Sequence, residues 1–418
     1  MSTVQSPRGT RDILPEQQPL WQHVYTTGQK VAEQMGFSRI TTPNYEYRTL
    51  FERAIGDGTD VMDKELFLLR SRGTEPGQEE YALRPEGTAG IVRAFIEHGM
   101  HLRPQPIKLY TFVNNFRYDR PQKGRYREHV QFDLEIFGDK SVFTDAWVIL
   151  AACQFLKELG LQNLDLHINS LGTLEERKAY EKALITALHE KSGQLSADSQ
   201  ARLEKNPLRI LDSKDANDQA LLNDLPKLSD FFGEESSKRF EDLQSYLRSW
   251  AIPFVINPRL VRGLDYYSHT VFELVSSEGS GQQGSLAGGG RYDGLVPQLG
   301  GQDVGAMGMG AGLDRIIEEM ERQGITIEDK KPALVAVIAA DNQSKQLAAL
   351  FLTTLLNRGL AVTAAFDKEG LSAQLKAANK ANAVTAYILG EEEFKNNSVL
   401  VKNLVDGSQV SESLDNYR

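Results

Sequence analysis

A cationic loop adjoins a strand-like run of polar residues in residues 114–138, NNFRYDRPQKGRYREHVQFDLEIFG. The first half, up to Arg127, holds five basic residues against one acid. Guanidinium groups stay charged and bind phosphate oxygens in pairs, so this loop is a candidate contact for phosphates or RNA. Gln131, Asp133 and Glu135 then alternate as one face of a strand, where carboxylates suit a cationic ligand.

These residues fit a long β-hairpin that has one apolar and one polar face. Pro121 and Gly124 mark the turn between two alternating strands. The polar face would carry Arg117 from the first strand and Gln131 and Glu135 from the second. An ordinary hairpin with a solvated polar face explains the pattern equally well. The apolar face is made by Tyr110, Phe112, Phe116 and Tyr118 in the first strand and by Phe132, Leu134 and Ile136 in the second.

A second stretch, LVRGLDYYSHTVFEL (260–274), also alternates like a strand. It places Arg262, Asp265 and two adjacent tyrosines within six residues. Because neighbours on a strand point to opposite faces, we expect one of Tyr266 and Tyr267 to line a pocket while the other packs. A tyrosine-rich core strand with an ion-paired arginine is an equally simple explanation.

Glycines recur at every second position within GAMGMGAGLDRIIEEM (305–320). Without a Cβ, Gly308, Gly310 and Gly312 would let the backbone approach a flat ligand, although close packing between strands is the simpler explanation. The spacing matches neither the dinucleotide fingerprint nor the phosphate-binding P-loop. Arg315 then lies at the start of a predicted helix.

The stretch YALRPEGTAGIVRAF (81–95) predicts a turn that leads into a helix. Glu86, Gly87 and Thr88 form this turn, with Thr88 as a candidate N-cap, and ordinary helix capping would explain all three. Other chemistries find little support. The sequence lacks H-E-x-x-H and G-x-S-x-G, and its seven histidines show no metal-ligand spacing.

The composition is that of an ordinary globular protein with two or three domains. The chain has 418 residues, 40% of them hydrophobic and 25% charged, and its apolar runs are too short to span a membrane. A single cysteine, Cys153, excludes an internal disulfide and a cysteine-cluster metal site. The N-terminus lacks an apolar signal segment, so we expect a cytoplasmic protein. The net charge of −10 argues against a general nucleic-acid coat but permits local RNA contact.

Shifts in composition divide the chain. Residues 1–325 predict a large domain, whose alternating strands and hairpin loops indicate an antiparallel sheet. Within it, a polar and charged segment of about 171–250 is typical of a helical insertion. A charged linker at 326–332 ends in proline. Residues 333–418 alternate continuous apolar strands with helices, which predicts a small α/β domain with a mostly parallel sheet and a last strand at 398–404.

Together these stretches resemble class II aminoacyl-tRNA synthetases, and most closely the histidyl-tRNA synthetase family. The resemblance runs nearly end to end. It implies an α+β catalytic domain, with an antiparallel sheet flanked by helices, followed by an anticodon-binding α/β domain. The matching stretches are PRGTRDILP (7–15), motif 1 (36–51), motif 2 (116–138), the histidine-specific signatures RGLDYYSHTVFE (262–273) and AGGGRYDGL (287–295), motif 3 (308–315), INSLG (168–172), NPLRILDSKD (206–215), ILGEEEF (388–394) and VLVKNL (399–404).

The resemblance implies an enzyme that activates L-histidine with ATP, releases pyrophosphate and transfers histidyl to the 3′ end of tRNA(His). Arg117 and Arg262 would be its catalytic residues. Arg117 would hold the ATP α-phosphate and the histidine carboxylate, and Arg262 would take the place at the α-phosphate that other class II enzymes give to a metal ion. Arg315 would bind the ATP tail. Because the attacking carboxylate is already ionised, no general base is needed.

The resemblance also implies how the amino acid is held. Glu86, Thr88 and Gln131 would hold the α-ammonium group, and Glu135 would lie at the imidazole together with two tyrosines. One departure is the pair His129-Val130 before Gln131, where many members carry an aromatic residue. The implied histidine site comprises Glu86, Gly87, Thr88, Gln131, Glu135, Arg262, Tyr266 and Tyr267.

The implied partners are tRNA(His), L-histidine, ATP and a second copy of the chain, with motif 1 at the interface of a C2 homodimer. Mg²⁺ would bind mainly through the ATP phosphates rather than through protein side chains. No membrane partner is expected. The candidates for contact with the acceptor end of the tRNA are Arg120, Lys123, Arg125 and Arg127.

Two non-catalytic alternatives belong to the same fold. One is the paralogue that regulates the first enzyme of histidine biosynthesis, which usually lacks an intact RGLDYY stretch and the C-terminal domain. The other is a synthetase-like sensor of uncharged tRNA, which usually sits in a longer chain and loses active-site residues. The retention of Arg117, Arg262 and Arg315 favours the enzyme.

Overall fold

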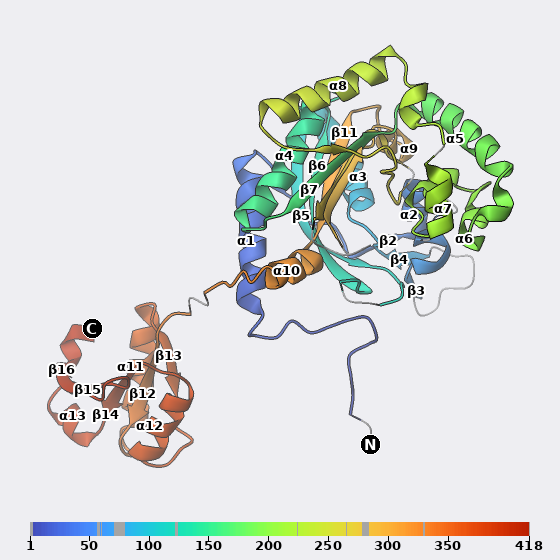
Figure 1. Cartoon of the computed structure of the whole chain (residues 1–418). Coiled ribbons are helices and arrows are strands. Elements are labelled where there is room, and N and C mark those ends of the chain that lie inside the picture. The colour runs from blue at the N-terminus through green and yellow to red at the C-terminus, as the bar shows by residue number, and fades with distance from the viewer. Residues whose placement is uncertain are drawn as a thin grey trace. The chain divides into compact units, whose positions relative to one another are not determined.

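The chain folds into two compact units, residues 1–327 and 328–418, and each unit has its own hydrophobic core (Figure 1). The structure is a computed structural model. It describes residues 3–56, 59, 61–70, 80–121, 124–223, 225–264, 266–277, 284–328 and 331–417. Lys123 and Asp265, which the sequence singled out, lie outside the described residues.

The first unit is built on a sheet that contains eight strands among the described residues. The expected antiparallel sheet is confirmed, although the pairings at its two edges, β1 with β5 and β7 with β8, are parallel. In sheet order the strands are β1 (Ser38–Arg39), β5 (Ile107–Phe116), β6 (Glu128–Phe137), β11 (Ala306–Gly312), β10 (Ser285–Arg291), β9 (Ser268–Ser276), β7 (Leu164–Ser170) and β8 (Val255–Ile256).

Helices cover both faces of this sheet. Phe132, Leu134 and Ile136 of β6 share one face, as their alternation predicted, and pack into the larger hydrophobic core. The helices on that face are α1 (Gln18–Gln34), α4 (Val142–Glu158), α8 (Glu234–Ser249) and α10 (Leu313–Arg322). The helices on the other face are α2 (Arg48–Ile55), α3 (Thr88–Glu97) and α9 (Leu295–Gln298).

A small second sheet is formed by residues that lie between β1 and α3 in the chain. Its strands, in sheet order, are β2 (Tyr45–Tyr47), β4 (Tyr81–Leu83) and β3 (Leu68–Leu69). It presents a group of exposed apolar side chains, and such groups on a protein surface commonly mark an interaction site. Those side chains are Tyr45, Tyr47, Leu68 and Leu69, with exposed fractions between 38% and 54%.

The helical insertion has a hydrophobic core formed mostly by residues 171–232, which Leu260 and Val271 of the main domain complete. Its elements are α5 (Leu174–His189), α6 (Ala197–Arg202), the 3₁₀ helix η4 (Pro207–Asp212) and α7 (Ala216–Leu222). Asp218 is fully buried there and accepts hydrogen bonds of 2.6–2.7 Å from the hydroxyls of Ser196, Ser199 and Ser213, which fastens η4 to its neighbours. By contrast, α8 packs against α4 in the core of the main sheet.

The second unit is an α/β domain, as expected, but its sheet is only partly parallel. β12 pairs in parallel with β13 and β14, whereas β14–β15 and β15–β16 are antiparallel. The prediction that the strand near 398–404 comes last is wrong, because β16 follows it through a short turn that contains a left-handed Gly407. The elements are β12 (Leu334–Ala339), α11 (Lys345–Asn357), β13 (Ala361–Ala364), α12 (Leu371–Lys380), β14 (Thr385–Leu389), α13 (Glu391–Lys395), β15 (Ser398–Asn403) and β16 (Gln409–Ser413).

Candidate active site

The pairing of β6 with β11 sets a row of polar side chains against a row of glycines. The paired residues are Gln131 and Gly312, Asp133 and Gly310, and Glu135 and Gly308. A Cβ at Gly308 would collide with the Glu135 carboxylate, and one at Gly310 would lie 3.0 Å from Asp133 Oδ1. Gly308 and Gly310 therefore make room for protein side chains, so close packing, the simpler of the two explanations from sequence, is confirmed for these two glycines. A Cβ at Gly312 would meet only the Arg315 side chain, at 4.0 Å.

Three carboxylates, Glu86, Asp133 and Glu135, are each no more than 4% exposed. Glu86 accepts hydrogen bonds from the backbone N–H groups of Thr88 (2.7 Å) and Ala89 (2.8 Å) at the start of α3. The Thr88 hydroxyl instead donates to Glu135 Oε1 at 2.7 Å. The prediction that Thr88 caps the helix is therefore wrong, because the preceding carboxylate already binds the exposed N–H groups.

Burial raises the pKa values of all three carboxyl groups, because a charged carboxylate loses solvation there. For Asp133, burial and the neighbouring Glu86 raise the pKa to about 8, although Arg84 and Arg117 oppose the shift. Burial raises the pKa of Glu135 well above its ordinary value, against hydrogen bonds from Tyr292 and Thr88. One oxygen of Asp133 is buried with no hydrogen-bond partner among the described residues.

Arg117 lies one residue beyond the end of β5, so the strand does not carry it as predicted. Its Nε donates to Pro85 O at 2.8 Å. The polar side of this hairpin is not a solvated face, because Asn115 is fully buried and donates from Nδ2 to Gln131 Oε1. Tyr118 was expected on the apolar face, but it is 54% exposed, since the chain has already left the sheet at that point.

Arg262 lies in the loop before β9. Its Nη1 is 3.5 Å from Glu273 Oε1, and its guanidinium lies 5.9 Å from the ring centre of Tyr267. The expectation that Tyr266 and Tyr267 point to opposite faces is wrong, because β9 begins only at Ser268. Their ring centres are 4.6 Å apart.

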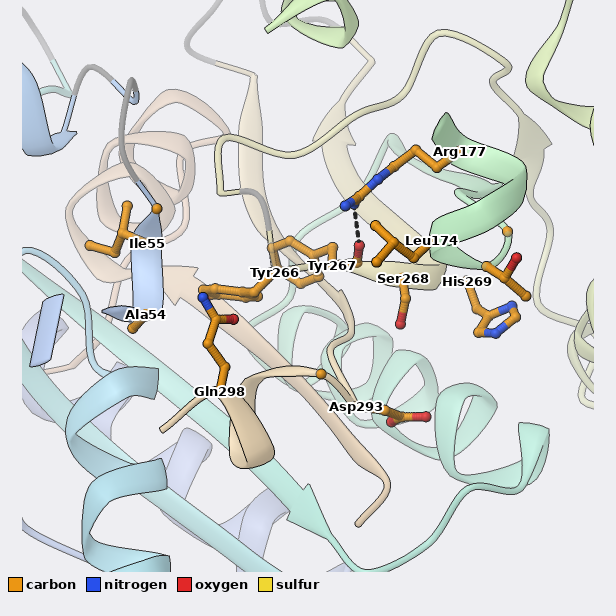
Figure 2. A pocket seen from close by; sticks show the side chains of 14 residues that line it. Ala54, Ile55, Leu174, Arg177, Tyr266, Tyr267, Ser268, His269, Asp293 and Gln298 are labelled. Atoms are coloured by element: carbon orange, nitrogen blue, oxygen red, sulfur yellow. Dashed lines mark hydrogen bonds between the residues drawn. The ribbon is translucent and has the colours of Figure 1, made fainter. Parts of the chain in front are cut away.

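Both tyrosines border a cavity of about 520 Å³ between α9 and the first turn of α5 (Figure 2). Arg177 of the insertion lines it and donates from Nη1 to Tyr267 O at 2.8 Å, the dashed line in Figure 2. His269 and Asp293 also line this cavity. The insertion thus holds the backbone of the stretch that carries the tyrosines.

A second cavity, of about 430 Å³, is lined by four of the arginines that the sequence singled out, Arg117, Arg125, Arg262 and Arg315, but not by Arg120 or Arg127. Gln131 and Tyr267 line it, whereas Glu86, Gly87, Thr88, Glu135 and Tyr266 do not. Among the described residues, neither Arg117 nor Arg315 has a carboxylate within ion-pair distance. The arginines of the lining are Arg117, Arg125, Arg209, Arg262 and Arg315.

Arg315 is held in this wall by carbonyl oxygens. Its Nε donates to Gly124 O and its Nη1 to Ser285 O, both at 3.2 Å. Burial and the nearby Arg125 lower the pKa of Arg315. His129 lines the same cavity, and burial together with Arg117 and Arg315 lowers its pKa to about 3. Its imidazole is therefore a neutral aromatic ring at neutral pH.

The described arginines of the loop differ in how tightly they are held. Arg120 is exposed. Arg125 forms an ion pair with Asp119. Arg127 donates from Nε to Asp119 O at 3.1 Å, and its guanidinium lies 3.7 Å from the ring centre of Tyr118.

Within the described parts of the chain, no group of three or more His, Cys, Asp or Glu side chains is arranged to hold a metal ion. No described helix is both long and apolar enough to cross a membrane.

The model of the family described as histidyl-tRNA synthetase matches residues 9–316. The chain belongs to this family. It is 42% identical over 412 residues to the histidine–tRNA ligase of Listeria monocytogenes serovar 1/2a, covering 98% of this chain and 96% of the relative. It is 41% identical over 410 residues to the histidine–tRNA ligase of Thermoanaerobacter sp. strain X514, covering 98% and 97%.

Solved structures agree on the fold. The crystal structure of apo S. aureus histidyl-tRNA synthetase matches with a TM-score of 0.80 at 31% identity, covering 99% of this chain and 98% of that one. The expected class II synthetase fold is thereby confirmed. A structure described as an ATP phosphoribosyltransferase regulatory subunit/histidyl-tRNA synthetase from Bacillus halodurans shares the fold at 22% identity and a TM-score of 0.63.

Sequence reasoning gave no role to Tyr292 or Arg11. The hydroxyl of Tyr292 donates to Glu135 Oε2. Arg11 Nη2 lies 2.5 Å from Asp314 Oδ1, while Asp314 Oδ2 accepts from the backbone N–H of Val130 at 2.9 Å. This links the N-terminal segment, β6 and α10. Both residues stand in stretches that matched the family, but no spacing in the sequence indicates which distant side chain each one meets.

Substituting Gly308 with alanine is expected to displace the Glu135 carboxylate, because the added Cβ has no space. Overpacking of this kind costs roughly 1–3 kcal/mol of unfolding free energy. Thermal unfolding and calorimetric titration with histidine measure the two effects, and Gly308→Ala should lose histidine binding. Gly193→Ala is the control, since a Cβ there meets nothing within 4 Å. Unchanged histidine binding in Gly308→Ala would contradict this account of the glycine row.

Proposed function

We propose that the chain is a histidine–tRNA ligase. The observation that carries the proposal is the pairing of an arginine-lined cavity with a cluster of buried carboxylates next to it. Phosphates need the first, and an amino acid's ammonium group needs the second. Relatives that are named histidine–tRNA ligases, at 40–42% identity over nearly the whole chain, support the same conclusion.

In the first step the histidine carboxylate attacks the α-phosphorus of ATP, and pyrophosphate leaves. We assign to Arg117 and Arg262 the contacts with the α-phosphate, and to Arg315 the contact with the ATP tail. These groups lower the barrier by aligning the reactants and by stabilising charge on the phosphoryl oxygens. Loss of one such donor costs roughly 2.7–4 kcal/mol in the transition state, by analogy with oxyanion-hole deletions.

Histidine would be held on the β6 side of the site. We assign the α-ammonium to Glu86, Thr88 and Gln131, and the imidazole to Glu135 and the tyrosine pair. A buried carboxylate left unmatched by an apolar side chain is costly, so this arrangement rejects apolar amino acids by about 10⁴-fold or more. Tyr292, which donates to Glu135, would orient that carboxylate.

The second step transfers the histidyl group to the terminal ribose of tRNA(His). We infer that the exposed Arg120 and its neighbours in the motif 2 loop meet the acceptor end, and that residues 328–418 bind the anticodon. Mg²⁺ would be bound through the ATP phosphates and would neutralise their charge. The cytoplasmic location expected from the sequence remains a prediction.

Purified protein is expected to exchange labelled pyrophosphate into ATP only when histidine is present. Arg262→Ala should lose most of this exchange while still binding histidine, because it removes a phosphate contact but leaves the carboxylate cluster intact. Exchange assays and histidine titration calorimetry measure the two properties separately. Absence of histidine-dependent exchange in the unmutated protein would eliminate the enzyme and favour a non-catalytic regulator.

Histidine binding is expected to tighten as the pH rises from ~6.5 to 8. In the free protein the pKa of Asp133 is about 8, so this carboxyl is protonated below that pH. A nearby α-ammonium favours the ionised form and lowers the pKa, so binding releases a proton. The association constant should therefore rise by up to about tenfold per pH unit. Calorimetry in buffers of different ionisation enthalpy measures the proton release, and Asp133→Asn should abolish it. Equal release from both proteins would rule out Asp133 as the source.

We also propose a C2 homodimer formed through the small sheet β2–β4–β3 and motif 1. The exposed apolar side chains there support it, and isologous interfaces bury such patches against their own copy. Leu68→Asp is expected to shift the protein to monomer in sedimentation, because a charge would be desolvated at the interface. Leu350→Asp, at a residue of α11 that is 65% exposed, is the control. A Leu68→Asp protein that sediments as the unmutated dimer would refute this interface.

A further inference from the structure

The insertion contributes one arginine to the arginine-lined cavity, and the proposed roles leave it unassigned. Arg209 lies on the 3₁₀ helix η4. With three residues per turn, this helix stacks Pro207 above Ile210 on one side and Arg209 above Asp212 on another. Pro207 and Ile210 are buried, whereas Arg209 and Asp212 line the cavity. Burial of the apolar side thus turns Arg209 toward the site.

The Arg209 guanidinium is anchored next to Arg262. Its Nη2 donates to the carbonyl oxygen of Gly263, the residue that follows Arg262. Its Nε is buried without a hydrogen-bond partner among the described residues, and the Nε of Arg262 is in the same condition. A buried N–H group that lacks an acceptor is destabilising, so both groups are expected to meet an acceptor when the site is filled.

The charge of Arg209 is not neutralised by the protein. Among the described residues, no carboxylate lies within 4 Å of it, and its anchor is a neutral carbonyl. Arg117 and Arg315 are held in the same way, by carbonyl oxygens alone. The other arginines of the cavity differ, because Arg125 pairs with Asp119 and Arg262 lies near Glu273. Three uncompensated guanidinium groups around one cavity fit a ligand that carries several negative charges.

We propose that Arg209 contacts a phosphate oxygen of bound ATP, so that the insertion completes the phosphate-binding wall of the catalytic unit. The proposal rests on the proposed ligase function. It makes Arg209 a substrate-binding residue rather than a purely structural one, and it gives the NPLRILDSKD stretch a role in ATP binding. The insertion also donates through Arg177 to Tyr267 O, so it meets the Gly263–Tyr267 segment at both ends.

The test compares Arg209→Ala and Arg209→Lys with the unmutated protein in pyrophosphate exchange without tRNA. Arg209→Ala is expected to lower kcat/KM for ATP by about 10- to 100-fold, mainly through KM, and to leave KM for histidine unchanged. Arg209→Lys should recover part of the loss, because lysine keeps the charge but not the planar fork. Calorimetric titration with ATP alone should show the same order of affinities.

Arg259→Ala is the matched control. Arg259 also links the insertion to this loop, through hydrogen bonds to Gln219 (2.6 Å) and Asn223 (2.5 Å), but it does not line the cavity. Equal losses in Arg209→Ala and Arg259→Ala would reduce Arg209 to a structural link and overturn the proposal. So would an Arg209→Ala protein that keeps its ATP affinity and loses only tRNA charging, since Arg209 would then bind the acceptor end.

Failure of the proposed function is distinguishable from failure of this inference. An unmutated protein without histidine-dependent exchange would remove the ligase, whereas ATP titration still reports on Arg209. If the unmutated protein exchanges and Arg209→Ala matches it in both assays, the ligase stands and this inference falls.

Discussion

The arrangement of the site depends on the strand β11, which presents no side chains where β6 presents polar ones. Carboxylates in the middle of a sheet would ordinarily collide with the residues of the next strand. Here Gly308 and Gly310 leave the space that the carboxylates of Glu135 and Asp133 fill. Because the register of an antiparallel pair is fixed in steps of two, a slip by one residue would move the whole polar row to the apolar face. Phe132, Leu134 and Ile136, on the opposite side of the same strand, hold the register through the core.

The carboxyl groups and the arginines of the site are neutralised in different ways. Asp133 and Glu135 are buried and their pKa values are raised. In the free protein, bound protons therefore neutralise part of the negative charge of these carboxyl groups. The basic wall cannot lose its charge in that way, because arginine stays protonated. Its guanidinium groups are positioned by carbonyl oxygens, which fix their direction without pairing their charge. A cationic amino acid and an anionic nucleotide are the complements of these two surfaces.

Local patterns in the sequence correctly predicted the features that residues close together in the chain determine. The alternation in 128–137 gave the buried face of β6, and Arg315 lies in the first turn of α10 as expected. Errors arose where distant contacts decide the outcome. Tyr266 and Tyr267 continue the alternation of β9, yet they lie before its first residue, and their backbone is held by Arg177 of the insertion. β16 was missed because its residues, QVSES, carry little apolar signal and pair at an edge.

Distant contacts also explain why the family signatures alone did not distinguish arginines that bind a ligand from arginines that stabilise the fold. Arg291, in the signature AGGGRYDGL, is fully buried and is satisfied by Asp145, Asp293 and two carbonyl oxygens, so its charge serves the fold. Arg209, in a stretch that drew no functional assignment, keeps an unneutralised charge beside a cavity. Both are arginines in matched motifs, and what distinguishes them is the position of carboxylates, Asp145 remote in sequence and Asp293 two residues away, around Arg291. A guanidinium that the fold leaves without a counter-charge fits an anion supplied from outside, and in this site we propose that the anion is the nucleotide.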